Sequence, residues 1–317
     1  MRLPLLISSI LFWVVLTPSA NAVSGLTEKS SKTRKSDIAI RVEGEGWGEA
    51  DTEEVESVLH AVADELATRV PMRLPISIVV SHTDREPMVL YEKEGTGEYR
   101  VRLHAHDRRW GEYVYEFAHE LCHIMSNYDA HRSRDSRKYN QWFEETLCET
   151  ASLYTLRSMA LTWSSAPPRP GLEGYAARLN AFAQQLIMEE HRNLPDGTPL
   201  AEWLRENEEA LRNDPYLREK NEIVAKLLLP LFEQDPENID SLHYLNLDPA
   251  EARTDLQQYL HAWYDNAPAR HKIFVASILK LLGVDTPLGV RVYVKPVAPK
   301  YPEGGAGSAG QAGPSKY

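Results

Sequence analysis

The chain has only two cysteines among its 317 residues, Cys122 and Cys148. Two cysteines can form at most one disulfide, so a disulfide-rich scaffold is excluded. Basic residues are also scarce, with 35 lysines and arginines against 46 acidic residues and a formal net charge of −11. No broad positive field is available to hold nucleic acid or an anionic membrane, and neither is an expected partner.

Long apolar runs are missing after the first 22 residues, so no later segment is expected to cross a bilayer. Residues 1–22 contain one basic residue, Arg2, then an apolar stretch over 3–16 and an Ala20-x-Ala22 ending, which is typical of a cleavable secretory signal. A membrane anchor is the competing interpretation, but Pro18 breaks the run before the roughly 20 apolar residues of a span. We therefore expect a secreted or periplasmic protein with no stable membrane insertion after signal cleavage.

The rest of the chain divides into a folded part and two polar ends. Residues 23–36 lack periodicity and predict a flexible leader, while the Pro-, Gly- and Ala-rich residues 291–317 predict a disordered tail. The best internal boundary is SSAPPRPG at 164–171, which separates an expected catalytic core over 37–165 from a helical lobe over 166–290.

Hydrophobic periodicity predicts an α+β fold. Alternating residues predict strands at 38–43, 76–81, 88–93 and 99–105, and apolar spacing of three or four predicts a helix over 50–70. A helix is expected from Tyr113 and another from Gln141, with an exposed loop over 128–141 between them. Further helices are expected at 172–191, 199–212, 216–233, 250–264 and 269–282. The expected architecture is a small mixed sheet packed against two helices, followed by a mostly helical lobe that completes a cleft.

The stretch YEFAHELCHIM at 115–125 contains the pattern H-E-x-x-H. On a helix, His119 and His123 lie on one face at the spacing needed to share a zinc ion, and Glu120 can reach a water molecule beside the metal. Chance also produces this pattern, so its context matters. Here it falls on an amphipathic helix after several strands, and QWFEETLCETASLY follows at 141–154.

Together these segments resemble the gluzincin zinc metallopeptidases of the peptidase MA-like superfamily, in which a second helix supplies a glutamate as third zinc ligand. WFEETLCET at 142–150 resembles the W-x-x-E-G-x-A-E segment of many members. The resemblance covers about 113–160. It implies one zinc ion per chain with His119, His123 and Glu145 as ligands and Glu120 as the general base.

Three glutamates, Glu144, Glu145 and Glu149, compete for the third position. Glu145 and Glu149 are four apart and share a helix face, whereas Glu144 points about 100° away. We expect Glu145 to bind the ion and Glu149 to accept a hydrogen bond from the free N–H of a ligand histidine, so that Glu144 matters least. The alternative is a solvated acidic face.

Two positions depart from the resemblance. Thr146 stands where the group usually has glycine, and Cys148 where it usually has alanine, so the packing between the helices is expected to differ. Cys122 and Cys148 both lie in these two helices, which makes them a candidate disulfide in an oxidising compartment. Two buried thiols that act as small apolar residues are an equally good interpretation.

Other side chains are weaker candidates. His104 and His106 point to one side of the strand at 99–105 and could suggest a second metal, although a polar edge facing solvent or the cleft rim is simpler. The strand itself resembles the edge strand on which such peptidases lay an extended substrate. In the family a Tyr or His from the C-terminal helices stabilises the tetrahedral oxyanion. The candidates, none of which is preferred, are His243, Tyr244, Tyr216, Tyr259 and Tyr264.

The expected function is an exported zinc peptidase acting on peptides or proteins. A rival is a noncatalytic binding or scaffold protein with a structural zinc, whose fourth ligand could be Cys122 or Cys148. A zinc amidohydrolase acting on a nonpeptide amide would use the same chemistry. The cleavage preference, endo- or exo-action and the oligomeric state stay open.

Overall fold

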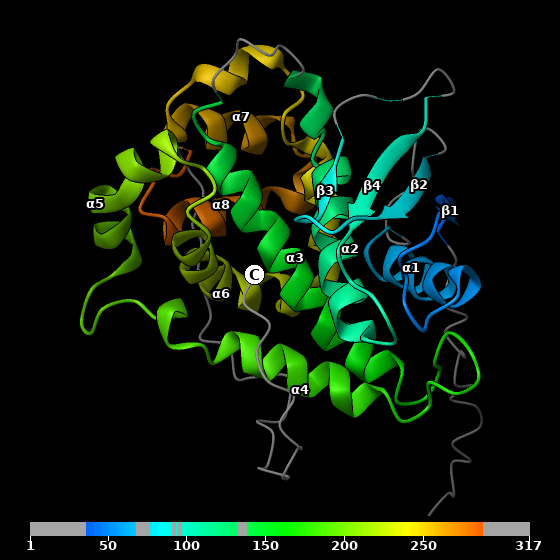
Figure 1. Cartoon of the computed structure of the whole chain (residues 1–317). Coiled ribbons are helices and arrows are strands. Elements are labelled where there is room, and N and C mark those ends of the chain that lie inside the picture. The colour runs from blue at the N-terminus through cyan, green and yellow to red at the C-terminus, as the bar shows by residue number, and fades with distance from the viewer. Residues whose placement is uncertain (1–35, 68–75, 91–92, 94–96, 132–137, 288–317) are drawn as a thin grey trace, which may run out of the picture. The chain divides into compact units, whose positions relative to one another are not determined.

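The structure is a computed structural model that describes residues 36–67, 76–90, 93, 97–131 and 138–287 (Figure 1). The predicted signal, the leader except for its last residue, the predicted tail, and residues 132–137 of the predicted loop lie outside the described residues. The α+β prediction is confirmed, with a small four-stranded mixed sheet and a mostly helical C-terminal region. Within the described ranges, no helix is long and apolar enough to span a bilayer.

The sheet contains strands β1 (Ala39–Glu43), β2 (Ser77–His82), β3 (Met88–Val89) and β4 (Tyr99–Leu103) in the order β1-β2-β4-β3. β1, β2 and β4 are parallel, and β3 is antiparallel to β4. Side chains alternate between the two faces of a strand, and most of the buried side chains lie on one face. Helix α1 (Thr52–Ala67) and the helix that follows β4 pack on this sheet. The buried side chains of this face are Ile40, Val42, Ile78, Val80, Val101 and Leu103, and Val79 is buried on the opposite face.

The prediction that residues 99–105 form the edge strand is wrong. β4 lies between β2 and β3, and β3 pairs Val89 with Val101 and Met88 with Arg102. The Leu90 N–H also donates to the Arg100 carbonyl at 2.9 Å. The two segments alternate equally well in sequence, and periodicity carries no information on which of them lies outermost.

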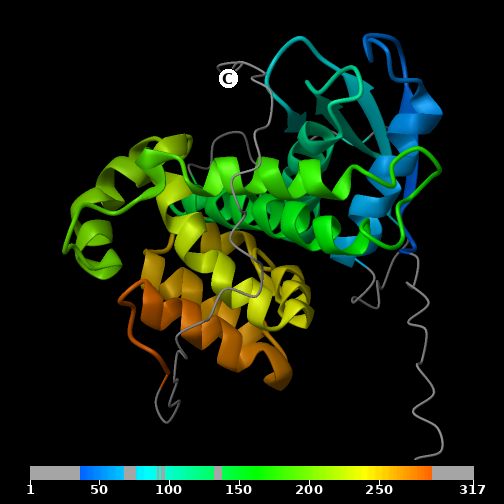
Figure 2. The same ribbon diagram turned by 90° about the horizontal axis from the view of Figure 1, so that it is seen from below.

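Two long helices form the centre of the fold. α2 (Trp110–Met125) begins three residues before the predicted start, and α3 (Gln141–Thr162) begins where predicted. α2 packs against α1 and the sheet, while α3 packs against α2, α4 (Ala176–Ile187) and α6 (Arg218–Gln234). Figures 1 and 2 show α3 between the sheet side and the C-terminal helices. α3 is therefore buried around most of its circumference, which places its glutamates away from bulk water.

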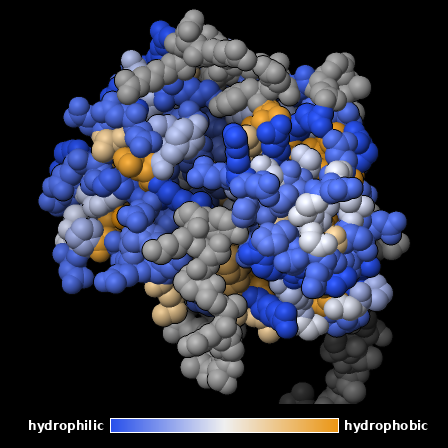
Figure 3. Space-filling model, viewed as in Figure 1, coloured by the Kyte–Doolittle hydropathy of each residue, from blue (hydrophilic) through white to orange (hydrophobic). Residues whose placement is uncertain are grey.

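The C-terminal helices follow the predicted order with two differences, and the first is that α4 is four residues shorter at each end than the predicted 172–191. α5 (Leu200–Asn213) and α8 (Ala269–Leu281) match prediction closely, but α7 (Leu256–Asn266) begins six residues late. Its start is set by Asp255, whose side chain accepts a hydrogen bond from the Gln258 N–H at 2.8 Å. Pro249–Arg253 and Pro236–Tyr244 form 3-10 segments instead. The face seen in Figure 3 is largely hydrophilic, with apolar residues in small separate patches.

The side chain of Glu116 on α2 forms hydrogen bonds with the backbone of the turn between β4 and α2. One oxygen of its carboxylate accepts hydrogen bonds from the backbone N–H groups of His104 and Ala105, at 2.8 and 3.0 Å. The side chain is buried, and burial raises the pKa of Glu116 to about 7 despite these two bonds. The Glu116 carboxyl therefore loses its proton at a higher pH in the folded chain than in the unfolded chain.

This shift predicts a pH dependence of stability. Because the folded pKa lies above the unfolded value of 4.5, the stability contributed by the protonated form is complete below that value and is lost as pH rises toward 7. The loss amounts to roughly 3 kcal/mol at most. Glu116→Gln keeps an oxygen that accepts both bonds and removes the titration. Urea unfolding of both proteins across this range should show their stability difference changing with pH, and a constant difference would contradict the prediction.

Candidate metal centre

Three predicted ligands come together between α2 and α3. The imidazole centroids of His119 and His123 are 5.0 Å apart. The Nε2 atoms of the two rings lie 3.2 and 3.4 Å from the same atom, Oε2 of Glu145. Donors bound at about 2.05 Å to one tetrahedral zinc ion are roughly 3.3 Å apart, and their imidazole centres roughly 5 Å apart. The three residues therefore fit a single metal ion in their present conformations.

The charges around these residues suit a bound cation. Burial by itself would raise the pKa of Glu145, but the charge of His123 and hydrogen bonds from both histidines hold that pKa well below its ordinary value. Burial would likewise lower the pKa of His123, yet the Glu145 charge and hydrogen bonds to Glu144 and Glu145 raise it well above the ordinary value. Without a metal, a proton on His123 partly balances the carboxylates; a divalent ion would replace it.

The orienting carboxylate is Glu144, and the predicted role of Glu149 is wrong. His123 Nδ1 lies 2.7 Å from Glu144 Oε1, which leaves Nε2 directed toward Glu145. A carboxylate that accepts from the second nitrogen of a ligand histidine fixes the orientation of the ring. After the three candidate ligands, Glu144 is therefore the residue expected to affect metal binding most. The sequence had predicted that it would matter least of the three glutamates.

Helix geometry explains the difference. Taking Glu144 as reference, successive residues turn by about 100°, so Cys148 lies at roughly 40°, Glu145 at 100° and Glu149 at 140°. α2 contacts a wide range of these angles on α3. The histidines lie opposite the part that begins at Glu144. Glu149 lies at the far side of this range, opposite Tyr115. The four-residue spacing of Glu145 and Glu149 shows that they share a helix face, but not which part of that face lies opposite the histidines.

A buried hydrogen-bond chain holds Glu144 in place. Its Oε2 accepts from Nδ2 of Asn246 at 3.1 Å, and the same amide donates to the Ser126 carbonyl at 2.9 Å. The Tyr259 hydroxyl donates to Asn246 Oδ1 at 2.8 Å. Asn246 is 2% exposed and has a φ of 56°, a left-handed conformation that asparagine tolerates better than most residues. The C-terminal part of the chain therefore supports the orientation of His123.

Glu149 belongs to a separate buried ion network. It accepts a short hydrogen bond from the Tyr115 hydroxyl and pairs with Arg192, whose Nη1 lies 2.7 Å from Glu149 Oε1. Arg192 is 1% exposed and also contacts Glu189 at 3.0 Å and Glu222 at 3.1 Å. Burial by itself would raise the pKa of Glu149, but the neighbouring arginine charges lower it. Glu149 therefore works with Arg192 to join α3 to the helical lobe.

Removing the cation from this network should be costly. Arg192→Met removes the buried cation that pairs with Glu149, and removing one partner of a buried ion pair typically destabilises a protein by about 3–5 kcal/mol. Arg218→Met is the comparison at the exposed side of the same network: the Arg218 side chain is 57% exposed, pairs with Glu222 and donates to the Tyr115 hydroxyl at 3.1 Å, and its exposed ion pair should contribute less than about 1 kcal/mol. Chemical denaturation of the two variants measures the difference. Equal losses would show that the buried pair is not the stabilising one.

Glu120 lies beside the three candidate ligands, whose charges contribute to its pKa. It is 4% exposed, and the backbone of Val89 in β3 lies close enough to lower the pKa of its carboxyl. Burial raises the pKa of Glu120, which the histidine charges only partly oppose. In an antiparallel pair, neighbouring residues direct their N–H groups to opposite sides. Since Leu90 donates toward β4, the Val89 N–H points away from β4, to the outer side of β3, and α2, which carries Glu120, packs against β3.

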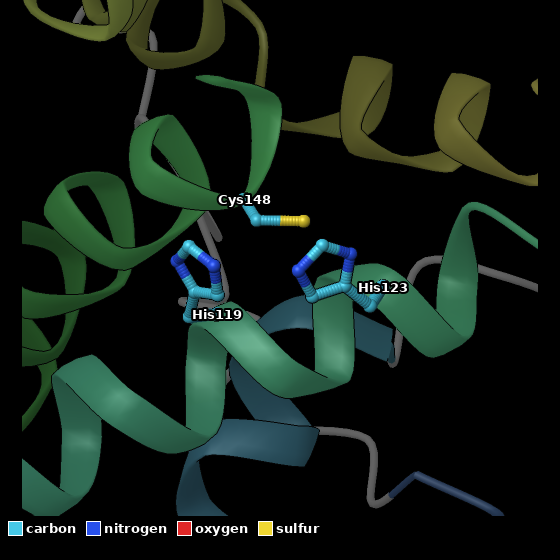
Figure 4. A group of neighbouring side chains, drawn as sticks. All are labelled: His119, His123 and Cys148. Carbon is cyan, nitrogen blue, oxygen red and sulfur yellow. The ribbon is translucent and has the colours of Figure 1, made fainter. Parts of the chain in front are cut away.

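Both cysteines are free and fully buried, which fits the thiol interpretation of the sequence. Figure 4 shows Cys148 reaching from α3 toward the two histidines. Its sulfur and one nitrogen of each of His119 and His123 all lie within 4.8 Å of one another. From the sequence, either cysteine was a candidate for a fourth ligand. Cys122 on α2 and Cys148 on α3 lie on the facing sides of the two helices, next to this site.

The structure does not favour a second metal at His104 and His106. Their rings are 6.0 Å apart, and Arg109 Nη2 lies 2.6 and 3.0 Å from the two nitrogens of His106. This guanidinium would repel a cation. A further group with metal-ligand spacing, Glu189, His191 and Glu222, already pairs with Arg192.

Most of the oxyanion candidates are engaged elsewhere. Tyr259 donates to Asn246, Tyr216 accepts from Gln141 on an exposed surface, and the ring of Tyr264 lies 4.4 Å from the Lys272 ammonium. Tyr244 packs against His271. His243 Nε2 is buried and has no hydrogen-bond partner among the described residues. His243 is therefore the one of the five whose side chain is not engaged by a described residue, and its role stays a prediction.

Comparisons with protein-family models, curated proteins and solved structures found no match to this chain.

Proposed function

We propose that the protein is an exported zinc-dependent peptidase. The observation that carries this proposal is the meeting of two imidazole nitrogens with one Glu145 oxygen, at 3.2 and 3.4 Å, beside the buried carboxylate of Glu120. The three ligands would hold one zinc ion per chain. Three protein ligands leave a coordination position free, which is the arrangement of catalytic rather than structural zinc sites.

Each residue has a distinct task in the reaction. Zinc, when bound, supplies Lewis acidity toward a carbonyl oxygen and toward water. Glu120 would take a proton from the attacking water and deliver it to the leaving amine. Glu144 would hold the His123 ring so that Nε2 faces the ion. No covalent intermediate with the protein is needed.

The corrected strand order also bears on the substrate. β3 is the outer strand beside Glu120, so an extended peptide that pairs with β3 would pass close to the base. Backbone pairing of this kind suits peptides better than other amides. A zinc amidohydrolase and a noncatalytic zinc protein are the competing functions, and the second would not require a buried base beside the metal.

The proposal is tested by incubating the mature protein with a mixed peptide library, with and without a chelator, and identifying cut sites by mass spectrometry. We expect cleavage that the chelator abolishes and added zinc restores. Zinc binding without cleavage of any peptide would favour the noncatalytic alternative.

A further inference from the structure

A partly exposed arginine lies close to the candidate metal ligands. Arg218 is the first residue of α6, which packs beside α3 (Figure 1). Its Nη2 donates to the Tyr115 hydroxyl at 3.1 Å and its Nε donates to Glu222 at 3.0 Å, yet the side chain is 57% exposed. Nη1 has no hydrogen-bond partner among the described residues. The protein therefore holds one edge of the guanidinium in place and leaves Nη1 available to a ligand.

Tyr115 fixes the position of Arg218 relative to the metal site. Tyr115 and His119 are four residues apart on α2, and their partners Glu149 and Glu145 are four residues apart on α3. The two pairs are therefore successive contacts between the same two helices, separated by about 6 Å along the helix axes. Because Arg218 lies 3.1 Å from the Tyr115 hydroxyl, its guanidinium is roughly 6–10 Å from the candidate ligand atoms.

The segment that carries Arg218 reaches α3 on both sides of Glu145. Tyr216 accepts a hydrogen bond at 2.8 Å from Gln141, which lies one turn before Glu145 on α3. Arg218 lies at the level of Glu149, one turn after Glu145. The side chains of Tyr216 and Arg218 are both mostly exposed. Residues 216–218 therefore border the metal site on a side that faces solvent, where a substrate can approach.

The buried network does not need the charge of Arg218. Arg192 is 1% exposed and already pairs with Glu149 at 2.7 Å and with Glu222 at 3.1 Å. The remaining ion pair, between Arg218 and Glu222, involves a mostly exposed cation and adds little stability. A cation held in a fixed orientation beside the site, but not required by its neighbours, is suited to binding an anionic group of a ligand.

We propose that Arg218 binds a carboxylate of the substrate, so that the protein prefers peptides with a carboxylate one or two residues from the scissile bond. This inference rests on the proposed function. Extended chain advances about 3.3 Å per residue, so one or two residues, together with the contacts at each end, span the distance to the metal ligands. Nη1 and the second N–H of Nη2 can bind both oxygens of one carboxylate. A free C-terminus and an Asp or Glu side chain both supply this group.

Paired substrates test the proposal. The mixed peptide library is prepared once as C-terminal acids and once as C-terminal amides, and the amides include peptides with Asp or, in its place, Asn. We expect the protein to cleave the carboxylate member of a pair with a kcat/KM roughly 10–100-fold above that of the neutral member. Arg218→Met should remove this preference and leave cleavage of the neutral peptides within about threefold. Arg218→Lys keeps the charge but loses the planar fork, so its preference should be intermediate.

Arg41→Met is the matched control. The Arg41 side chain is 56% exposed, close to that of Arg218, and it pairs with Glu43 on β1, away from α3. This variant should keep the full preference for carboxylates. A preference for acids over amides would identify the C-terminus as the group bound and the enzyme as an exopeptidase. A preference for Asp over Asn in amidated peptides would identify a side chain. Either result supports the proposal if Arg218→Met abolishes it.

Equal cleavage of charged and neutral peptides would overturn the proposal and leave the peptidase function intact, as would a preference that survives in Arg218→Met. Binding is measured separately by retention of both libraries on immobilised, zinc-loaded Glu120→Gln protein, with and without the additional Arg218→Met substitution. Retention of carboxylate peptides that depends on Arg218, without hydrolysis by the unsubstituted protein, would support the carboxylate site and reject the peptidase. Retention that does not distinguish the paired peptides would overturn the carboxylate site, whatever the activity.

Discussion

Glu120→Gln should abolish most hydrolysis while leaving the metal in place. The substitution removes the proton acceptor beside the site but keeps the size of the side chain and does not touch His119, His123 or Glu145. General-base catalysis typically contributes about 10²–10⁴ in rate, so turnover should fall by at least about 10². The measurement is metal per chain together with peptide turnover on the same sample.

Glu112→Gln is the matched control for this experiment. It makes the same chemical change on the same helix, but Glu112 pairs with Arg109 near the start of α2 and takes no part in the site. Turnover of the control should stay close to that of the unsubstituted protein. If Glu120→Gln keeps full activity, Glu120 is not the base, whatever the metal content.

The parts of the fold that follow from local periodicity were predictable. α2 and α3 carry long apolar patterns, and their boundaries differ from prediction by three residues or fewer at the start. The start of α7 was missed because Asp255 caps the helix after a 3-10 segment whose apolar spacing resembles that of a helix. The order of β3 and β4 depends on contacts between strands, which alternation along one strand does not encode.

The residues of the site also divide into those that local spacing predicts and those that depend on packing between elements. His119 and His123 are related by spacing within one helix, and the structure places both beside Glu145 as the resemblance implied. Which carboxylate orients His123 depends on the rotation of α3 against α2, a property of packing between helices. Asn246 is a further contributor that the sequence analysis did not identify, since it lies more than 100 residues beyond Glu144 in the chain. No short motif signals such a contact.

Substitutions of the three glutamates of α3 should have different effects on metal affinity and on stability. Glu145→Gln removes a ligand, so metal should be lost at low chelator concentration and hydrolysis should fall to background. Glu144→Gln removes the charged acceptor of the His123 N–H, for which a loss of about 10–100-fold in metal affinity or activity is typical. Glu149→Gln should leave metal affinity close to that of the unsubstituted protein, because Glu149 pairs with Arg192 and Tyr115 instead of a histidine.

Stability should follow a different order in the same three variants. Glu149→Gln weakens a buried ion pair with Arg192, so it should lower the free energy of unfolding of the metal-free protein. Metal per chain is measured across a graded chelator series, and urea unfolding is measured without metal. A Glu149→Gln variant that loses metal as readily as Glu144→Gln would contradict the orienting role of Glu144, since global destabilisation would then explain both. Loss of affinity in Glu144→Gln, with Glu149→Gln losing only stability, would support two functions for carboxylates about 140° apart on one helix.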